Sequence, residues 1–369
     1  MRVLFAGGGT GGHLYPALAV AQHLRRTRRD FECIFLGAEN GLEREIVPRE
    51  GFTLHAIPGS GFRRLGLGGR LRFFWSLARG LLHAIGLVWR WRPDVVLATG
   101  GYASLAGGLA AFLCRKPLAV QEQNRIPGMA TRLLGSMARR IYVAFPGTES
   151  AFRRRDRVIC VGNPVREQLR QASAPPPGLP AGVPVILVVG GSRGARSING
   201  AVGAAIPLVA AQIRATWLWQ TGRLDHAELA ARWRHEESVI VREFLPDMGA
   251  AYAAATLVVC RSGAMTLAEI TLLGKPAILV PFPGAVDDHQ TANATVLSAA
   301  GAAILLPDAE LRGETLAHEV CTLLRSGEHL AQMAARSRQL GRPDATRELA
   351  ADLVRLSAKS GEEAHVRAG

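Results

Sequence analysis

Residues 2–13 read RVLFAGGGTGGH, an apolar run that ends in a glycine-rich turn. Residues 185–195 repeat this arrangement as VILVVGGSRGA, and a helix-like segment follows each turn. Glycine lets the backbone approach a phosphate closely, and the amides at the start of the following helix bind negative charge. The sequence therefore predicts a buried strand, an anion-binding turn and a helix at the start of each half of the chain.

Short apolar runs bounded by glycine or proline alternate with helix-like segments along the whole chain. Strands this apolar are typical of a parallel sheet that helices cover on both faces. In the first half the expected strands are residues 2–6, 31–36, 53–57, 94–98, 118–121, 141–144 and 158–161. In the second half they are residues 185–189, 216–220, 239–244, 257–260, 277–280 and 303–306. We expect an α/β fold with two tandem Rossmann-like domains.

A proline-rich stretch separates the two halves. Residues 171–184 contain five prolines, so no regular element is expected there. The predicted division is an N-terminal domain over 1–163, a linker over 164–184, a C-terminal domain over 185–341, and a C-terminal helix and tail over 342–369. Two such domains joined by a linker predict a ligand-binding cleft between them. Within the C-terminal segment, residues 345–356 have the pattern of an amphipathic helix.

The positive charge is distributed unevenly. The 369 residues include 44 Lys and Arg and 30 Asp and Glu, a net charge of +14. Residues 1–162 hold 24 basic and 10 acidic residues, a net of +14, whereas residues 163–369 hold 20 of each, a net of zero. This asymmetry indicates that the first half faces an anionic partner, either a membrane surface or nucleic acid. No nucleic-acid-binding motif accompanies the arginines, so we expect an anionic phospholipid surface and no nucleic acid.

Lysine usage excludes one class of protein, and cysteine usage indicates the redox compartment. The chain has three lysines, and none lies in a Walker A motif, which excludes a P-loop nucleotidase. The five cysteines form no CxxC pair and no cluster with histidine, so they are expected to be thiols in a reducing compartment.

Residues 61–92 mix arginine with large apolar side chains. The apolar part of the segment is short and contains Arg79 and His83, so it does not predict a transmembrane helix. A basic, aromatic-rich helical hairpin lying on an anionic leaflet fits better, and ordinary packing of a helix on the sheet is the alternative. The expected membrane contacts are Phe62, Arg63, Arg64, Arg70, Arg72, Phe73, Phe74 and Trp75.

Further turns follow other predicted strands. Residues 99–104 read TGGYAS, and residues 260–270 read CRSGAMTLAEI. Thr266 and Glu269 are three residues apart and share a helix face, where the carboxylate is suited to the two hydroxyls of a ribose. A solvated helix carboxylate is the alternative. The first turn also matches the GxGxxG pattern of dinucleotide-binding proteins, with Glu39 near the end of the second strand, but this match alone is weak.

Seven strings, in this order along essentially the whole chain, together resemble the MurG family of peptidoglycan glycosyltransferases. They are GGTGGH at 8–13, GGYAS at 100–104, QEQN at 121–124, GNPVR at 162–166, GGSRGA at 190–195, CRSGAMTLAE at 260–269 and DDHQTANA at 287–294. The resemblance implies the B-type glycosyltransferase fold, with the active site in the cleft between two Rossmann-like domains. It also implies inverting transfer of N-acetylglucosamine (GlcNAc) from UDP-GlcNAc to the C4 hydroxyl of MurNAc in undecaprenyl-pyrophosphoryl-MurNAc-pentapeptide (lipid I), which gives lipid II.

The same resemblance implies a location and a cellular role. Such an enzyme is expected at the cytoplasmic face of the plasma membrane as a peripheral protein, acting in cell-wall synthesis, cell shape and cell division. Other cell-wall and division proteins are expected partners. The alternatives with the same fold are a UDP-sugar transferase for another lipid acceptor such as diacylglycerol, and a UDP-GlcNAc 2-epimerase. A basic binding module without enzymatic activity is a third alternative.

The resemblance also assigns binding residues. It implies that Leu245 contacts uracil through its backbone, that Gln290 and Asn124 bind the GlcNAc hydroxyls, and that Arg166 lies near the nucleotide. The remaining UDP-GlcNAc contacts that it implies are Thr10, Gly11, Gly12, Ser192, Ala264, Met265, Thr266, Leu267, Ala268 and Glu269. The implied acceptor contacts are Gly100, Gly101 and Tyr102. The family often has Ile at the position of Leu245 and Gln at that of Arg193.

Inverting displacement requires a base for the acceptor hydroxyl and stabilisation of the leaving diphosphate. His13, at the end of the first glycine turn, and Glu122, at the end of an apolar strand, are the candidate catalytic bases, and each is also suited to organising its loop. Helix amides with Arg166 or Arg261 are candidates for binding the diphosphate. The chain has no DxD string, so we expect no essential metal ion and no other cofactor.

Overall fold

The computed structural model describes residues 1–58, 67–171, 174–191 and 194–366, and it describes the side chains in these ranges except those of 67–74 and 359–366. Contacts divide the chain into two compact units. The first unit is Met1–Arg166 together with Pro343–Gly369, and the second is Glu167–Arg342. A 3-10 turn, η3 (Glu167–Arg170), lies inside the segment expected to be the linker.

The first unit is built on a seven-stranded sheet in the order β3-β2-β1-β4-β5-β6-β7. Every pair of neighbouring strands is parallel. The strands are β1 (Arg2–Ala6), β2 (Glu32–Ala38), β3 (Thr53–Ile57), β4 (Val95–Ala98), β5 (Leu118–Glu122), β6 (Arg140–Val143) and β7 (Val158–Cys160).

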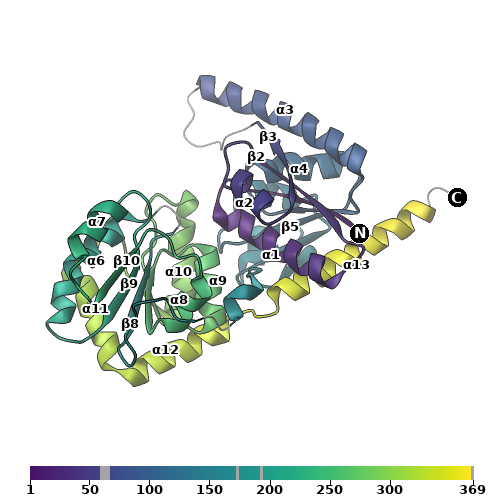
Figure 1. Ribbon diagram of the computed structural model, residues 1–369. Helices are drawn as coiled ribbons and strands as arrows, with labels where there is room; N and C mark the ends of the chain where they lie inside the picture. Colours follow the sequence, from purple (N-terminus) through teal and green to yellow (C-terminus); the bar gives the residue numbers. More distant parts are fainter. Residues whose placement is uncertain (59–66, 172–173, 192–193, 367–369) are drawn as a thin grey trace. The chain divides into compact units, whose positions relative to one another are not determined.

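Helices cover both faces of this sheet (Figure 1). On one face, Leu14 and Leu18 of α1 pack with Leu349 and Leu353 of α13. On the other face, α3 packs on α4, and Ala84, Val88 and Ala106 are fully buried there. The helices are α1 (Gly11–Thr27), α2 (Glu43–Arg49), α3 (Leu67–Trp91), α4 (Tyr102–Leu113), α5 (Met129–Gly135) and α13 (Ala345–Val366), with 3-10 turns η1 (Thr148–Ala151) and η2 (Arg155–Arg157).

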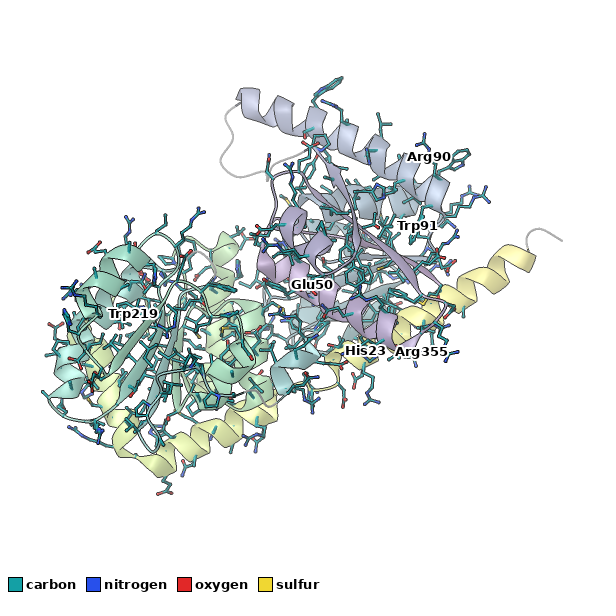
Figure 2. All side chains as sticks on the ribbon, viewed as in Figure 1. His23, Glu50, Arg90, Trp91, Trp219 and Arg355 are labelled. Carbon is teal, nitrogen blue, oxygen red and sulfur yellow. The ribbon has the colours of Figure 1, made fainter. Side chains whose placement is uncertain are left out.

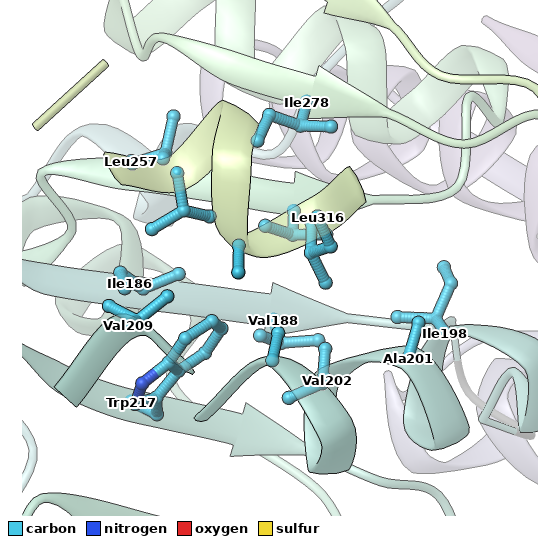
Figure 3. Close-up of a cluster of buried hydrophobic side chains, with 14 of the residues drawn as sticks. Ile186, Val188, Ile198, Ala201, Val202, Val209, Trp217, Leu257, Ile278 and Leu316 are labelled. Carbon is cyan, nitrogen blue, oxygen red and sulfur yellow. The ribbon is translucent and has the colours of Figure 1, made fainter. Parts of the chain in front are cut away.

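The second unit repeats this plan on a six-stranded parallel sheet in the order β10-β9-β8-β11-β12-β13. Its core contains Ile186, Val188, Trp217, Leu257 and Ile278 (Figure 3). The strands are β8 (Val185–Val189), β9 (Thr216–Gln220), β10 (Val239–Arg242), β11 (Leu257–Cys260), β12 (Ala277–Leu279) and β13 (Ala303–Leu305). The helices are α6 (Arg196–Ala210), α7 (His226–Trp233), α8 (Met248–Ala254), α9 (Ala264–Leu273), α10 (His289–Ala299), α11 (Gly313–Arg325) and α12 (Gly327–Leu340), with the 3-10 turn η4 (Val286–Asp288).

In both sheets, the order in which the chain adds strands reverses near the centre. The chain first adds strands on one side of β1 or β8, and then crosses to the other side through β4 or β11. In doubly wound sheets, ligands bind at this switch point, beyond the carboxyl ends of the strands. The glycine turns that follow β1, β4, β8 and β11 therefore lie where this topology places a binding site.

The structure confirms the predicted α/β class and all thirteen expected strands, with bounds that differ by at most two residues. The helical hairpin expected within 61–92 is wrong, because the described part is one continuous helix, α3. Gly80 does not break this helix. It is buried where a methyl group would come within 3.1 Å of the Tyr102 hydroxyl and 3.2 Å of Ile57, so a residue without a side chain lets α3 pack closely.

The predicted C-terminal helix returns to the first unit. Its residue Asp352 accepts a hydrogen bond from the Tyr142 hydroxyl at 2.9 Å and pairs with Arg140 at 3.2 Å. Burial and the Asp352 charge raise the pKa of Tyr142 well above its usual value, so this hydroxyl stays a donor. The C-terminal helix thus completes a core made mostly by the first half of the chain.

Candidate active site

The glycine turns after β1 and β4 lie against each other. The Gly8 amide is 3.4 Å from the Gly100 carbonyl, and a methyl group on Gly101 would come within 2.5 Å of the Gly8 carbonyl oxygen. Gly8, Gly100 and Gly101 all have positive φ angles, of 148°, 104° and 83°, which favour glycine. The close approach and the backbone conformation therefore both require glycine here.

His13 lies in the first turn of α1, against the turn that follows β4. Its Nδ1 is 3.1 Å from the Gly8 carbonyl oxygen and 3.3 Å from the Thr10 hydroxyl, and a methyl group on Gly100 would overlap its ring. A carbonyl oxygen accepts and cannot donate, so the contact with Gly8 favours a proton on Nδ1. In the neutral ring the lone pair is then on Nε2, the nitrogen that a general base would use.

A carboxylate that the sequence analysis did not select supports this turn. Glu43, at the start of α2, is fully buried, and it accepts hydrogen bonds from the Gly9 amide at 2.8 Å and the Ala38 amide at 2.7 Å. Glu39, the acid considered there, is exposed. Glu43 cannot be selected from the sequence, because no motif links it to the first glycine turn. Its role becomes visible only through its contacts in the folded chain.

Glu122 is buried at the end of β5, where both of its carboxylate oxygens accept hydrogen bonds. Oε1 accepts from the Asn124 amide at 2.9 Å, and Oε2 accepts from the Gly128 amide at 3.0 Å and from the Thr131 hydroxyl. The Asn124 side chain also donates to Oε1 at 3.3 Å. This carboxylate organises the loop between β5 and α5 and orients Asn124.

Buried amides connect the ends of β4 and β5. The Gln123 side chain donates to the Thr99 carbonyl at 2.8 Å and to Gln121, and the Gln121 side chain donates to Asn163 at 2.9 Å. Asn163 in turn donates to the Gln123 carbonyl at 3.1 Å. The QEQN and GNPVR strings thus meet in one network that holds the turn at Gly100.

Two other candidates of the first unit lie near these turns. The Tyr102 hydroxyl donates to Ser76 of α3 at 3.3 Å, and burial raises the pKa of Tyr102. The Arg166 guanidinium lies 5.0 Å from the ring centroid of Tyr15 in α1, a cation–π contact that holds it beside the helix that begins at the first turn.

The turn after β8 has a different support. Gly194 has a φ of 78°, and a side chain there would overlap the Thr221 carbonyl. The Gln220 side chain, at the end of β9, donates to the Gly191 carbonyl at 3.2 Å and accepts from the Leu245 amide at 3.0 Å. Gln220 thus links the turn after β8 to Leu245, the residue whose backbone the family resemblance assigns to uracil, and the Leu245 amide is already used in this link. Ser192 and Arg193 lie outside the described residues.

Helix α9 starts directly after β11 and Gly263. Met265, Thr266, Ala268 and Glu269 are half-buried, whereas the Ala264 and Leu267 side chains are buried in the core, so those two positions offer only backbone groups to a ligand. The Ser262 hydroxyl before the helix is fully buried and has no hydrogen-bond partner among the described residues.

Tyr252 orients the Glu269 carboxylate. Its hydroxyl donates to Glu269 Oε2 at 3.0 Å. Burial, reinforced by the Glu269 charge, raises the pKa of Tyr252 well above its usual value. The same two causes raise the pKa of the Cys260 thiol to about 12. The raised pKa values keep both groups protonated at neutral pH, so the Tyr252 hydroxyl remains a hydrogen-bond donor to Glu269.

Two polar candidates of the second unit have structural partners. Gln290 accepts a hydrogen bond from the Phe282 amide at 2.9 Å. Arg261 forms an ion pair with Asp308 at 2.5 Å and donates to the Ser197 hydroxyl at 2.7 Å and the Pro281 carbonyl at 3.0 Å. Asp308 offsets the charge of Arg261, which makes this arginine the weaker of the two cationic candidates.

No group of three His, Cys, Asp or Glu side chains suited to a metal ion occurs in the part of the chain that the structure describes.

Models of two domains match the chain in the order of its two units. Residues 3–143 match the glycosyltransferase family 28 N-terminal domain, and residues 185–349 match the glycosyltransferase family 28 C-terminal domain. MurG from Acinetobacter baumannii has a solved structure with a TM-score of 0.75 and 30% identity, which covers 96% of this chain and 99% of that one. The chain belongs to the MurG family of glycosyltransferases.

Curated relatives of the family extend this similarity over nearly the full length. The relative from Nitrosococcus oceani is 44% identical over 354 residues, which is 95% of this chain and 97% of the relative. The relative from Anaeromyxobacter sp. strain K is 42% identical over 352 residues, 95% of this chain and 91% of the relative. Both are named UDP-N-acetylglucosamine–N-acetylmuramyl-(pentapeptide) pyrophosphoryl-undecaprenol N-acetylglucosamine transferase.

Within each unit, the family strings converge at the carboxyl ends of the sheet. In the first unit, His13, Gly100 and Gly101 are in contact, and the Gln123 side chain holds the Thr99 carbonyl directly before that turn. In the second unit, Gln220 joins the turn after β8 to Leu245, and Tyr252 joins α8 to Glu269 of α9. The family strings are thus held together by buried side chains, of which Gln220 and Tyr252 lie outside the strings.

Proposed function

We propose that this chain transfers GlcNAc from UDP-GlcNAc to the C4 hydroxyl of MurNAc in lipid I, with inversion at C1, and so makes lipid II. The observation that carries the proposal is the similarity, at 40–44% identity over nearly the whole chain, to relatives named for this transfer. The family turns also lie at the switch points of both sheets, where this fold binds its ligands.

His13 is the catalytic base in this proposal. The Gly8 carbonyl holds a proton on Nδ1, so Nε2 accepts the proton of the MurNAc hydroxyl. The hydroxyl oxygen bonds to C1 of GlcNAc, the bond from C1 to the UDP oxygen breaks, and its electron pair leaves with UDP. Glu122 serves as a positioning residue, because each of its oxygens already accepts two hydrogen bonds.

The second unit binds the donor in this proposal. Glu269 accepts hydrogen bonds from the ribose hydroxyls, and Tyr252 fixes its carboxylate for that purpose. Backbone amides after Gly191 and at the start of α9 stabilise the diphosphate, with Ser192 and Thr266 as hydroxyl donors and Arg166 as the cation. The Leu245 backbone contacts uracil. Gln290 and Asn124 bind the GlcNAc hydroxyls, and Thr10, Gly11 and Gly12 contact the donor from the first unit.

The acceptor is a lipid, and α3 supplies a suitable membrane-facing surface. Trp75, Leu82 and Trp89 are 70%, 69% and 70% exposed, and because they are seven residues apart they form one stripe along the helix. Arg79 and Arg90 on the same helix are exposed. Figure 2 labels Arg90 near the end of this helix. No helix among the described residues is both long and apolar enough to cross a bilayer.

An exposed apolar stripe with flanking arginines is suited to the interface of an anionic leaflet, where each basic residue contributes about 1 kcal/mol. We therefore place the protein at the cytoplasmic face of the plasma membrane, whose leaflet carries that charge. Of the membrane contacts expected from the sequence, Trp75 is described and exposed. Phe62, Arg63 and Arg64, and the side chains of Arg70, Arg72, Phe73 and Phe74, lie outside what the structure describes.

The transfer is tested with labelled UDP-GlcNAc and a short-chain lipid I analogue, with diacylglycerol as the competing acceptor. Label in a lipid II analogue supports the proposal. Label in glycosyl diacylglycerol alone overturns the acceptor, and release of UDP without any acceptor indicates an epimerase. Product of inverted anomeric configuration is expected.

Membrane binding is tested by cosedimentation with vesicles that contain anionic phospholipid. The triple variant Trp75→Ser, Leu82→Ser, Trp89→Ser is expected to lose most binding, and salt is expected to weaken binding of the wild type. Leu224→Ser is the matched control, because Leu224 is 74% exposed on the second unit. Equal losses for the triple variant and the control would overturn the assignment of α3.

A further inference from the structure

The buried carboxylate of Glu43 has no role in the transfer described above. It is fully shielded from solvent, and its hydrogen bonds join two loops that follow neighbouring strands. Oε1 accepts from the Ala38 amide at the end of β2, and Oε2 accepts from the Gly9 amide in the turn after β1. Burying a carboxyl group costs free energy unless hydrogen bonds compensate, and these two amides supply such hydrogen bonds.

Three glycines make room for this side chain. A methyl group on Gly8, Gly37 or Gly41 would overlap Glu43. These glycines come from the turn after β1, from β2 itself and from the loop before α2. The backbone thus encloses the carboxylate from three sides, and the two amides hold both of its oxygens.

The same turn holds His13. Gly9 is fixed by Glu43, and the preceding residue, Gly8, directs its carbonyl at His13 Nδ1 and its amide at the Gly100 carbonyl. A change in the peptide between Gly8 and Gly9 would turn that carbonyl away from the histidine. The position of His13 therefore depends on the contact between Glu43 and Gly9.

We propose that Glu43 is a positioning residue, an internal anion that takes the place of a ligand anion on the Gly9 amide and thereby fixes the turn that holds His13. The inference rests on the proposed function for its catalytic consequence. The Gly9 amide already donates to this internal carboxylate, so that amide is not available to a phosphate of the kind that a dinucleotide-binding turn holds.

The test compares Glu43→Gln, Glu43→Ala and the control Glu45→Gln, an exposed carboxylate of the same helix whose ion pair with Arg49 lies on the surface. Glutamine keeps the size but directs an N–H donor at one of the two amides. We expect kcat of Glu43→Gln to fall by about 10- to 100-fold, as for other displacements of a catalytic group, with donor KM within twofold of the wild type. The control is expected to match the wild type.

Glu43→Ala adds a rescue experiment. Its cavity exposes the Gly9 and Ala38 amides, so acetate is expected to restore part of kcat, whereas chloride at equal ionic strength is not. Urea unfolding of each variant separates loss of folded protein from loss of kcat. Wild-type kcat in folded Glu43→Gln, or equal effects of acetate and chloride, overturns the proposal.

Hydrogen exchange distinguishes this proposal from the proposed function. Amides of residues 7–13 are expected to exchange faster in Glu43→Ala than in the wild type and to regain protection with acetate. If the wild type does not glycosylate the lipid I analogue, the proposed function fails, and this exchange result still decides whether Glu43 holds the turn. Unchanged exchange of these amides in Glu43→Ala overturns the proposal that Glu43 holds the turn.

Discussion

The glycine turns after β1 and β8 have the same place in their sheets but different supports. At the first turn, the Glu43 carboxylate accepts the Gly9 amide. At the second, the neutral Gln220 side chain donates to the Gly191 carbonyl and accepts from Leu245. A carboxylate repels a nearby phosphate and an amide does not. The difference favours the second turn for the donor diphosphate, whereas in the first turn the peptide between Gly8 and Gly9 is held by Glu43 and contacts His13.

The largest effect is expected from removing the imidazole of the first turn. His13→Ala should lower kcat by about 100- to 10,000-fold, the range for loss of a general base, with little change in the affinity for UDP-GlcNAc. Steady-state kinetics and calorimetric titration with UDP-GlcNAc measure the two quantities. His23→Ala, farther along the same helix, is the control. A loss of donor affinity equal to the loss of kcat would contradict the division of roles.

Giving the second turn the charge of the first is expected to weaken donor binding. Gln220→Glu places a carboxylate beside Gly191, and repulsion of the diphosphate should raise the Kd for UDP-GlcNAc by about tenfold, which corresponds to 1.4 kcal/mol. Gln220→Leu removes both hydrogen bonds, including the one from the Leu245 amide that a glutamate still accepts, but adds no charge, so it should weaken binding less. If both variants bind UDP-GlcNAc equally, charge is not what distinguishes the two turns.

A smaller change in donor binding is expected at the other turn of the second unit. Tyr252→Phe removes the hydrogen bond to Glu269 but keeps the ring, and the loss of about 1 kcal/mol should raise donor KM by roughly fivefold. Glu269→Gln, which alters the proposed ribose ligand itself, should raise donor KM more. Competition experiments with UDP measure donor binding by both variants. Equal KM values for Tyr252→Phe and the wild type would show that this hydroxyl does not orient the carboxylate.

The last prediction concerns pH and stability, and it leaves activity at neutral pH unchanged. The pKa of Cys260 is raised from 9.0 to about 12, so the unfolded chain loses this thiol proton at lower pH than the folded chain. This contribution to stability is complete below about pH 9 and decreases as pH rises toward 12, by at most about 1.4 kcal/mol per pH unit. Urea unfolding at pH 8, 9 and 10 should show a steeper decline in the wild type than in Cys260→Ala. Parallel declines of stability in the wild type and in Cys260→Ala would contradict the assignment of this pH dependence to Cys260.

The sequence predicts the strands well because strands buried between two helical layers are continuous apolar runs. The helical hairpin was wrong because composition does not show where a helix ends, and Gly80, which lies opposite Tyr102 and Ile57, fits inside the continuous helix α3. Local sequence patterns predict helices and strands, but they do not show which residues of other helices or strands pack against a given position.

The candidate site follows the same distinction. His13, Gly100 and Glu269 belong to compact strings that the sequence displays, and so they can be selected without a structure. Glu43 and Tyr252 act through residues that are distant along the chain, and no local pattern distinguishes them from a surface carboxylate or a core tyrosine. Supporting residues of this kind become visible only once the sheet brings separate loops together.

Helix α13 has a consequence for the order in which the protein is made. Leu349, Ala350 and Leu353 fill the core beside α1, although the whole second unit is translated between α1 and α13. On the ribosome, the second unit therefore has all of its residues before the first unit has its last helix. The half of the chain that is synthesised first is the half whose core is completed last, and a nascent chain stopped before residue 345 leaves that core open to solvent.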